Sequence, residues 1–545
     1  MSRQVRKRYG PEPGDVAGFD EEIYAALRQS PWWMISISAH VALFVASSMF
    51  QSQGEATSPA SEMRVAQLPD ATPADPAEEP PEIADVTPVD VEVPRTVVED
   101  AKPADHDEDP TDMPFEDVGG GFDGISDSPW NGPSNNSLIG IGGSLGGGKL
   151  GLGGMYSLRR PRGAKQKIDV AVDDALRWLK AHQSPDGGWE CETFRKWCDL
   201  KPASGAGPEG AGKAAYDVGV TGMALLAFLG AGYTQRSDDA NGFGKVVAAG
   251  LRYLKNVQDA EGCFGNRSSG HYVYNHAIAA LAMVEAYGMT GSSVYKNPTQ
   301  KALDFIVVAR NPYFAWRYGV KPGDNDTSVS GWMMMALKSA KLINAADVKN
   351  GKAPSLTLDE DCFEGIKAWI DKMTDPDFGR VGYQARGTGP ARPTELVDRF
   401  PAEKSESMTG VGMLARIFLG ENPKTSDPIK KGAELCAKLA PSWNPNDGSI
   451  DMYYWYYATL AMFQVGGEPW NKWNKAMQGA IVDTQRKDTD YCMYKGSWDP
   501  LDPWGPDGGR VYSTSCMALC LEVYYRYDKV FGTKEDSTGG GTEHK

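Results

Sequence analysis

Three acidic residues begin apolar segments of this 545-residue chain and could act on a substrate: Asp326, Asp451 and Glu406. Carboxyl groups that face a common cavity can serve as general acid and general base. An acidic residue at the start of a helix can instead cap that helix by accepting hydrogen bonds from its free N–H groups. The sequence leaves both interpretations open, and all three residues are catalytic candidates.

Aromatic and polar residues near the same segment starts could line a pocket. A pocket for an apolar or sugar ligand is mostly apolar and aromatic, with a few polar groups that fix the orientation of the ligand. The aromatic rings could equally pack in a core. The ligand-binding candidates are Asp217, His276, Trp316, Tyr453, Trp455, Trp498, Trp504 and Tyr512.

Histidine and cysteine side chains raise the question of a metal site. His271 and His276, with Cys191 and Cys198, carry ligand atoms, but their spacing fits no metal-binding motif. We therefore predict no metal and no other cofactor. Cys191 and Cys198 are candidates for a loop disulfide if the folded body lies outside the cytoplasm.

The segments that carry these residues are the second members of helix pairs. The first helix of a pair is amphipathic, as where Val172, Ala175 and Leu179 share one face. The second helix is apolar nearly all round, and such a helix is buried on all sides. The pair recurs six times between residues 164 and 531, which is typical of a repeat architecture. Because an open solenoid needs polar-faced end repeats and we find none, we predict an all-α ring of six helical hairpins, an α6/α6 toroid.

Two loops after amphipathic helices carry a recognisable motif. WLKAHQSPDGGW (residues 178–189) and YLKNVQDAEGCF (residues 253–264) resemble the QW repeat of terpenoid cyclases. The chain as a whole resembles the prenyltransferase and squalene oxidase repeat proteins. This resemblance implies an α/α toroid and a structural, non-catalytic role for the motif. Its residues here are Gln183, Gly187 and Trp189, then Gln258, Gly262 and Phe264.

The activities of these families can be compared with the chain residue by residue. In the cyclase-like motif GDNDT (residues 323–327), Asn325 holds the position of the proton donor, and an amide has no acidic proton to give. The zinc-dependent prenyltransferases bind the metal with an aspartate, a cysteine and a histidine. In this chain Asp451 fits the aspartate, but Tyr453 and Ser513 stand where the cysteine and the histidine are needed. These departures favour a binding or scaffold protein for a hydrophobic, isoprenoid-type or glycan ligand. An enzyme of altered mechanism, either cyclase-like or a glycan hydrolase or lyase using cavity carboxylates, is the alternative.

An apolar segment precedes the body. Residues 31–50 contain no Asp, Glu, Lys or Arg, and twenty such residues span the hydrocarbon core of a bilayer as one helix. Five Lys and Arg residues precede this segment, so residues 1–30 should be cytoplasmic and the body should lie on the periplasmic side of a bacterial cytoplasmic membrane. A cleaved signal peptide is the alternative.

The two remaining segments, one on each side of the helix pairs, are predicted to be a linker and a tail. Residues 55–117 hold 19 acidic and 3 basic residues, which is the whole net charge of −16, and the remainder holds 53 of each. We predict a disordered linker over residues 51–163, acidic and Pro-rich and then Gly-rich, and a disordered tail over residues 532–545. Without a basic stripe in the body, residues 164–531, we predict no nucleic-acid binding.

Two polar residues lie inside the predicted membrane segment. Ser36 and His40 are four residues apart, on one helix face, and polar residues within a membrane are often functional. Together with the acidic linker, this spacing resembles the N-terminal anchor of TonB-type proteins. That resemblance implies proton-motor membrane partners, while a tolerated neutral histidine is the alternative.

Overall fold

The computed structural model describes residues 167–198, 209–487 and 494–523. These residues form twelve α-helices, four short 3₁₀ helices and two isolated β-bridges, with no β-strand. The outer helices are α4 (Lys167–Ala181), α6 (Phe243–Val257), α8 (Ser293–Ala309), α10 (Asp361–Met373), α12 (Asp427–Lys438) and α14 (Gly467–Val482). The inner helices are α5 (Asp217–Gly230), α7 (Tyr272–Thr290), α9 (Thr327–Lys349), α11 (Ser407–Phe418), α13 (Met452–Val465) and α15 (Gly505–Leu521).

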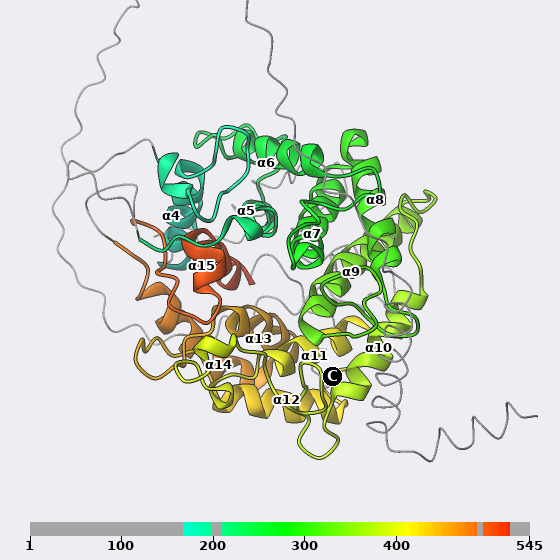
Figure 1. Ribbon diagram of the computed structural model, residues 1–545, viewed down its shortest axis with the longest axis vertical. Coiled ribbons are helices and arrows are strands. Elements are labelled where there is room, and N and C mark those ends of the chain that lie inside the picture. The colour runs from blue at the N-terminus through cyan, green and yellow to red at the C-terminus, as the bar shows by residue number, and fades with distance from the viewer. Residues whose placement is uncertain (1–166, 199–208, 488–493, 524–545) are drawn as a thin grey trace, which may run out of the picture. The chain divides into compact units, whose positions relative to one another are not determined.

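The helices form two layers around a common centre (Figure 1). In α4 the apolar face with Val172 and Leu179 is buried, and Arg177 on another face is exposed. In α5 every residue from Gly219 to Gly230 is buried. A helix with one apolar stripe suits an outer layer, whereas a helix without a polar face must be covered all round. The prediction of an all-α, two-layered architecture is confirmed for the described residues.

The ring is closed between its last and first helix pairs. Each inner helix contacts the next one, and α15 contacts α5. The Gln485 side-chain amide donates to the backbone carbonyl of Ala171 at 2.7 Å, across 314 residues of sequence. An ion pair of 2.6 Å joins Lys213 to Asp507 at the same junction. These contacts hold two distant parts of the chain together, as a toroid requires.

The predicted motif turns fasten their own helix pairs to the next outer helix. The Gln183 amide donates to Gly187 O at 2.8 Å, within its own turn, and to Val246 O of α6 at 3.0 Å. Gly187 has a φ of +99°, and a Cβ at this position would lie 2.3 Å from the Ala249 carbonyl oxygen. Only glycine tolerates both the backbone conformation and this close approach.

The second copy and a third, near the ring closure, repeat this geometry. The Gln258 amide donates to Gly262 O at 3.1 Å and to Pro298 O of α8 at 2.9 Å. In the third copy Gln485 bonds Gly496 O at 2.9 Å in addition to its bond to α4. Phe264 is fully buried where Trp189 stands in the first copy, and it lacks the indole N–H that Trp189 donates to Leu179 O at 2.8 Å.

Two inner helices have distinctive starts. α9 begins at Thr327, because Asp326 caps it. α15 begins at Gly505, with a kink at Gly509 where φ is +64°.

The predicted pairing of Cys191 with Cys198 is wrong. Cys191 is a buried free thiol, whereas Cys198 is disulfide-bonded. Burial raises the pKa of the Cys191 thiol well above its usual value. The Cys191 backbone N–H donates to Asp217, so this cysteine is held in the core at the start of α5.

The predicted membrane segment, linker and tail lie outside the described residues, as do Ser36 and His40. Among the helices that the structure describes, none is long and apolar enough to cross a membrane.

Candidate functional site

The starts of several inner helices meet at one end of the ring, which we call the mouth. Tyr216, directly before α5, places its hydroxyl 3.2 Å from Nδ1 of His271, directly before α7. The His271 ring packs edge-on against Tyr318, with the ring centroids 4.5 Å apart. Tyr318 lies in the loop before α9, and its hydroxyl is 2.5 Å from that of Tyr383. All four side chains are partly exposed, and we call them the mouth cluster.

Asp326 lies beneath the mouth cluster. Its Oδ1 accepts a hydrogen bond of 2.7 Å from the Val329 backbone N–H, which makes it the N-cap of α9. Its Oδ2 accepts from the Tyr383 hydroxyl at 3.3 Å and lies 3.8 Å from the Arg317 guanidinium. Complete burial raises the pKa of Asp326 to about 7, although Val329, Arg317 and Tyr383 each act to lower it. The carboxyl group is therefore partly protonated at neutral pH and reaches the exposed surface through Tyr383.

Asp451 and Asp502 form a second, closed carboxylate centre. Asp451 caps α13 through the Tyr454 N–H at 2.9 Å, and its other oxygen pairs with Arg392 at 2.7 Å. Asp502 accepts from the Met452 N–H at 3.1 Å and belongs to the same helix start. Burial, followed by the nearby charge of Asp451, raises the pKa of Asp502 to about 7. The Asp451 and Arg392 side chains are at most 3% exposed and Asp502 is 1% exposed, so solvent and ligands have no direct access.

Sequence reasoning missed Asp502 and the arginines beside the predicted acids. Asp502 accepts from the Tyr512 hydroxyl at 2.8 Å, and this bond holds the predicted ligand-binding residue Tyr512 in the closed centre. The only sequence signal for Asp502 is an acidic residue between prolines in the aromatic loop that ends at Trp504.

Glu406 belongs to a third ion pair. The Arg380 guanidinium donates to Glu406 Oε1 from Nε at 2.9 Å and from Nη2 at 2.6 Å. The Thr409 hydroxyl donates to the other oxygen at 2.7 Å. No hydrogen bond or ion pair of the described residues joins Glu406, Asp326 and Asp451. Each predicted catalytic acid has its own arginine, so the structure does not bring the three together.

His276 makes a contact that recurs in other helix pairs. Its Nδ1 accepts from the Phe264 backbone N–H at 3.1 Å, and its Nε2 lies 3.2 Å from the Ala302 carbonyl oxygen. Burial lowers the pKa of His276 to about 3, so the ring is neutral. A hydroxyl accepts the equivalent turn N–H at Thr221, Ser330, Thr409 and Thr514. The contacts of His276 are therefore those of a structural residue.

Three predicted ligand-binding tryptophans are fully buried. The Trp316 indole N–H donates to Ile306 O at 2.7 Å, and that of Trp498 donates to Ile481 O at 2.8 Å. Each bond satisfies a carbonyl near the end of an outer helix, as Trp189 does in the first turn. The Trp455 ring lies 6.1 Å from that of Trp443. These three indoles pack in the core.

Asp217 also lies at a helix start. It accepts from the Cys191 N–H at 2.7 Å, and burial raises its pKa to about 6. It is partly exposed, but its described contacts attach the first motif turn to α5.

A chain of hydroxyl groups lies at the starts of three inner helices. Ser328 Oγ is 3.0 Å from the Tyr274 hydroxyl and 2.9 Å from that of Tyr453, so α7, α9 and α13 are linked. The Trp332 indole N–H donates to Tyr274 at 3.1 Å. The Tyr453 ring is 6.3 Å from that of Trp504, which is partly exposed and whose buried indole N–H has no hydrogen-bond partner.

Three aromatic rings pack together next to this chain. Trp332 stacks on Tyr456 with the centroids 5.4 Å apart and meets Tyr457 edge-on at the same distance. All three are buried. Of the predicted ligand-binding residues, only Asp217 and Trp504 are partly exposed, and the other six are buried.

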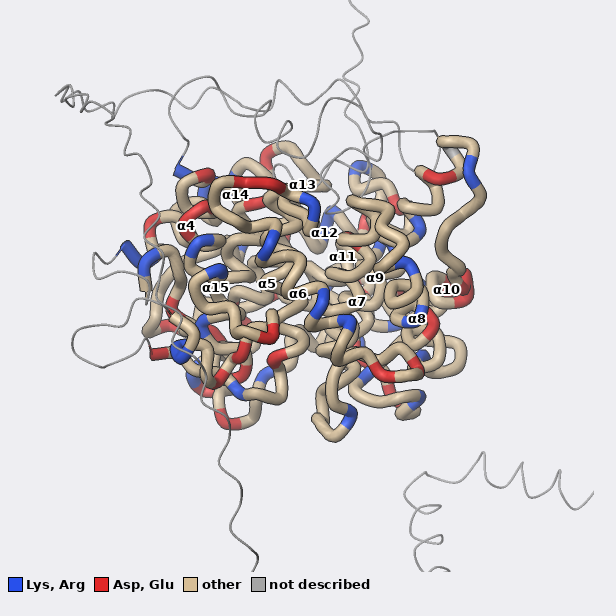
Figure 2. The backbone as a smooth tube through the Cα atoms, turned by 90° about the horizontal axis from the view of Figure 1, so that it is seen from above, with Lys and Arg blue, Asp and Glu red and all other residues tan. Residues whose placement is uncertain are grey.

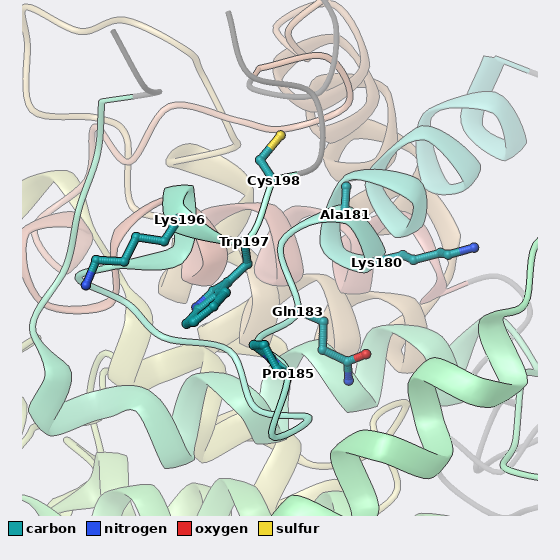
Figure 3. Close-up of a pocket in the computed structure, with 7 residues that line it drawn as sticks. All are labelled: Lys180, Ala181, Gln183, Pro185, Lys196, Trp197 and Cys198. Carbon is teal, nitrogen blue, oxygen red and sulfur yellow. The ribbon is translucent and has the colours of Figure 1, made fainter. Parts of the chain in front are cut away.

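Two open pockets lie away from the mouth cluster, beside the first motif turn. One, of about 450 Å³, is lined by Trp197, Cys198, Lys180 and their neighbours, with Lys180 and Lys196 pointing away from each other (Figure 3). The other, of about 460 Å³, shares Lys180 and Gln183. Gln183 is committed to backbone carbonyls, and Asp239 in the second pocket accepts from the Phe243 and Gly244 backbone N–H groups, so we place no chemistry there.

The charges of the body are mixed. Figure 2 shows Lys and Arg segments interspersed with Asp and Glu segments around the described ring. The described residues also hold no group of three or more His, Cys, Asp or Glu side chains placed to bind a metal ion.

Comparison with known proteins gives a distant relationship. No protein-family model matches the chain. It is 24% identical over 211 residues to a probable squalene–hopene cyclase of Sinorhizobium fredii (strain NBRC 101917 / NGR234), a match that covers 36% of this chain. The chain spans only 30% of the length of that cyclase. This similarity agrees with the cyclase-like toroid that the sequence predicted.

Solved structures resemble the chain at low identity. The α-1,6-mannanase GH76A of Salegentibacter sp. HEL1_6, as an inactive variant with α-1,6-mannotriose, is 10% identical, with a TM-score of 0.44 over 67% of this chain and 100% of that one. The type II terpene cyclase MstE from Scytonema is 11% identical, with a TM-score of 0.39 over 66% of this chain and 97% of that one.

Proposed function

We propose that this protein is a membrane-anchored binding or scaffold protein whose toroid holds a hydrophobic, isoprenoid-type or glycan ligand at its mouth. The observation that carries the proposal is the contrast between acids and aromatic residues there. Asp326, Asp451 and Glu406 are buried and each lies beside an arginine. The groups of the mouth cluster that remain partly exposed are three tyrosines and a histidine. Such a surface suits recognition better than proton transfer.

The position of the cyclase proton donor supports this proposal. The Asn325 side-chain oxygen accepts from the Ala315 N–H at 2.9 Å and from the Asn311 amide at 3.0 Å. The amide therefore stabilises the loop before α9. It has no acidic proton, and its oxygen is occupied by one backbone and one side-chain N–H group of the same loop.

The positions of the prenyltransferase zinc ligands are likewise occupied by protein contacts. Asp451 pairs with Arg392, and the Tyr453 hydroxyl contacts Ser328. The Ser513 hydroxyl donates to Trp498 O at 2.6 Å. A catalytic zinc site needs three protein ligands, and one carboxylate held by an arginine does not supply them.

One observation favours an enzyme as the second candidate. Asp326 has a pKa of about 7 and accepts a hydrogen bond from Tyr383, whose ring is partly exposed. A carboxyl group that is half-protonated near neutral pH suits general acid–base catalysis. Turnover would then depend on Asp326, whereas binding would depend on the mouth cluster.

Native mass spectrometry of the full-length protein in detergent tests the proposal. We expect a stoichiometrically bound small molecule in the wild type and in the Asp326→Asn variant, which keeps the helix cap and removes the ionisable group. A conversion of the bound molecule that Asp326→Asn abolishes would replace the binding proposal by the enzyme. If the protein retains no molecule and binds no added isoprenoid-type or glycan ligand, both the binding proposal and the enzyme are contradicted.

The membrane anchor is a separate part of the proposal. We propose that residues 31–50 hold the toroid on the periplasmic face and that Ser36 and His40 face proton-motor partners. The support is the uncharged stretch and the four-residue spacing. In-cell crosslinking from this segment should give motor-type partners that His40→Ala removes, and unchanged crosslinking would contradict the TonB-like role.

A further inference from the structure

We infer that the mouth cluster takes a neutral, hydroxyl-rich ligand of the glycan class, and not an anionic molecule or an isoprenoid lipid. This inference rests on the proposed binding function and names the ligand of the same site. Its basis is what the groups at the mouth can still offer after their protein contacts are counted.

The cations near the cluster are already paired. Arg317 forms an ion pair with Asp324 and lies 3.8 Å from Asp326. Lys213, near the start of α5, pairs with Asp507 at 2.6 Å. An anionic ligand would have to approach carboxylates that already neutralise these cations, and like charges repel at short range, whereas a neutral ligand meets no such repulsion.

The side chains of the mouth cluster itself are neutral hydrogen-bonding groups. Burial lowers the pKa of His271, which favours the uncharged imidazole. A tyrosine hydroxyl has one donor and two acceptor sites, and the short contact between Tyr318 and Tyr383 uses only part of them. An isoprenoid chain laid over these hydroxyls would remove them from water without replacing their hydrogen bonds, which is unfavourable. Sugar hydroxyls both donate and accept, so they can replace the lost water.

The aromatic rings of the cluster contact one another in succession. The Tyr216 and His271 rings are 5.7 Å apart and tilted by 30°, and Tyr318 follows edge-on at 4.5 Å. Such rings bury apolar area on one side while their polar atoms stay at the rim. A sugar ring has the same division, with C–H groups on its faces and hydroxyls at its edge, so it complements this surface.

An unpaired donor lies close to the hydroxyl chain at the helix starts. The Trp504 indole N–H is buried without a partner, and its ring contacts Tyr453, whose hydroxyl joins Ser328. A buried donor without a partner is uncommon and costly. A glycan hydroxyl that reached Trp504 would accept this hydrogen bond, whereas a hydrocarbon would leave it unmade.

Titration calorimetry on the full-length protein in one detergent tests the inference. The probes are three neutral oligosaccharides (maltohexaose, cellohexaose and mannohexaose), the anionic hexagalacturonate, and an undecaprenol. We expect saturable binding of at least one neutral oligosaccharide and of neither of the other two probes. Tyr318→Phe removes one hydroxyl and should weaken binding about fivefold, and Tyr318→Ala should weaken it further.

The matched control is Tyr313→Phe, because Tyr313 lies in the same loop and is 85% exposed, outside the cluster. Its affinity should equal that of the wild type. Saturable binding of undecaprenol or hexagalacturonate alone would overturn the ligand class and leave the binding function standing. Glycan binding that both Tyr318 variants leave unchanged would overturn the site. Binding of no probe, with no molecule retained in native mass spectrometry, would contradict the proposed function itself.

Discussion

Two carboxyl centres at the starts of the inner helices share one property and differ in another. Asp326 and Asp502 are both buried, and burial raises the pKa of each to about 7. Asp326 bonds Tyr383, which is partly exposed, whereas Asp502 bonds Tyr512, which is 7% exposed. A perturbed pKa is therefore not enough to identify a functional site in this fold. Contact with an exposed side chain distinguishes the two carboxyl groups. Asp326 can interact with a ligand through Tyr383, whereas Asp502 only stabilises the ring.

The largest expected effect is the loss of the arginine in the closed centre. Arg392→Met should lower the free energy of unfolding by about 3–5 kcal/mol, because it leaves Asp451 buried without its cation. Chemical denaturation of the full-length protein measures this loss. The control is Arg252→Met, on the exposed face of α6, for which we expect a change within about 0.5 kcal/mol. Equal stabilities for the two variants would show that the closed centre does not stabilise the fold.

The pH dependence of stability should reveal both carboxyl groups. A folded-state pKa of about 7, above the unfolded value near 4, means that the folded state binds the proton more tightly. Each group therefore contributes stability that is complete below about pH 4 and is lost as the pH rises to about 7.

Amide variants should remove these contributions one at a time. Between pH 4 and pH 8, the free energy of unfolding of Asp502→Asn and that of Asp326→Asn should each rise by on the order of 2–4 kcal/mol relative to that of the wild type. Denaturation curves at a series of pH values provide the measurement, and the difference from the wild type isolates the single group. A difference that is flat with pH for either variant would contradict the raised pKa of that residue.

The hydroxyl donors should differ according to exposure. Tyr512→Phe removes one of the two hydrogen bonds that the buried Asp502 Oδ2 accepts, leaving only that from the Met452 N–H, and should lower the free energy of unfolding by about 1–3 kcal/mol. Tyr383→Phe should lower it by about 0.5–1.5 kcal/mol, because water can reach the partly exposed position. Thermal and chemical denaturation compare the two variants directly. A larger loss of stability for Tyr383→Phe than for Tyr512→Phe would contradict our assignment of Asp502, and not Asp326, to the closed centre.

Much of the fold follows from the sequence because it depends on local periodicity. A stripe of apolar residues, as in α4, identifies an outer helix, and the continuous apolar run of α5 identifies an inner one. The motif glutamines bond neighbouring helix carbonyls, as Gln183 does, because their turn has a fixed length and geometry.

The partners at the mouth could not be predicted in the same way. Tyr383 and Arg392 lie in the long excursion between α10 and α11, and they reach Asp326 and Asp451 from 57 and 59 residues away. No periodicity describes the path of such a loop. Asp502 was missed for the same reason, because only the folded chain brings it to the start of α13.

The most direct test compares ligand retention when either the mouth cluster or the closed carboxylate centre is altered. Native mass spectrometry of full-length Tyr318→Ala, Asp502→Asn and wild-type protein, each purified in the same way, measures the fraction that carries a bound molecule. We predict that Tyr318→Ala loses the molecule while Asp502→Asn keeps it at the wild-type fraction. Retention in Tyr318→Ala together with loss in Asp502→Asn would contradict a ligand site at the mouth.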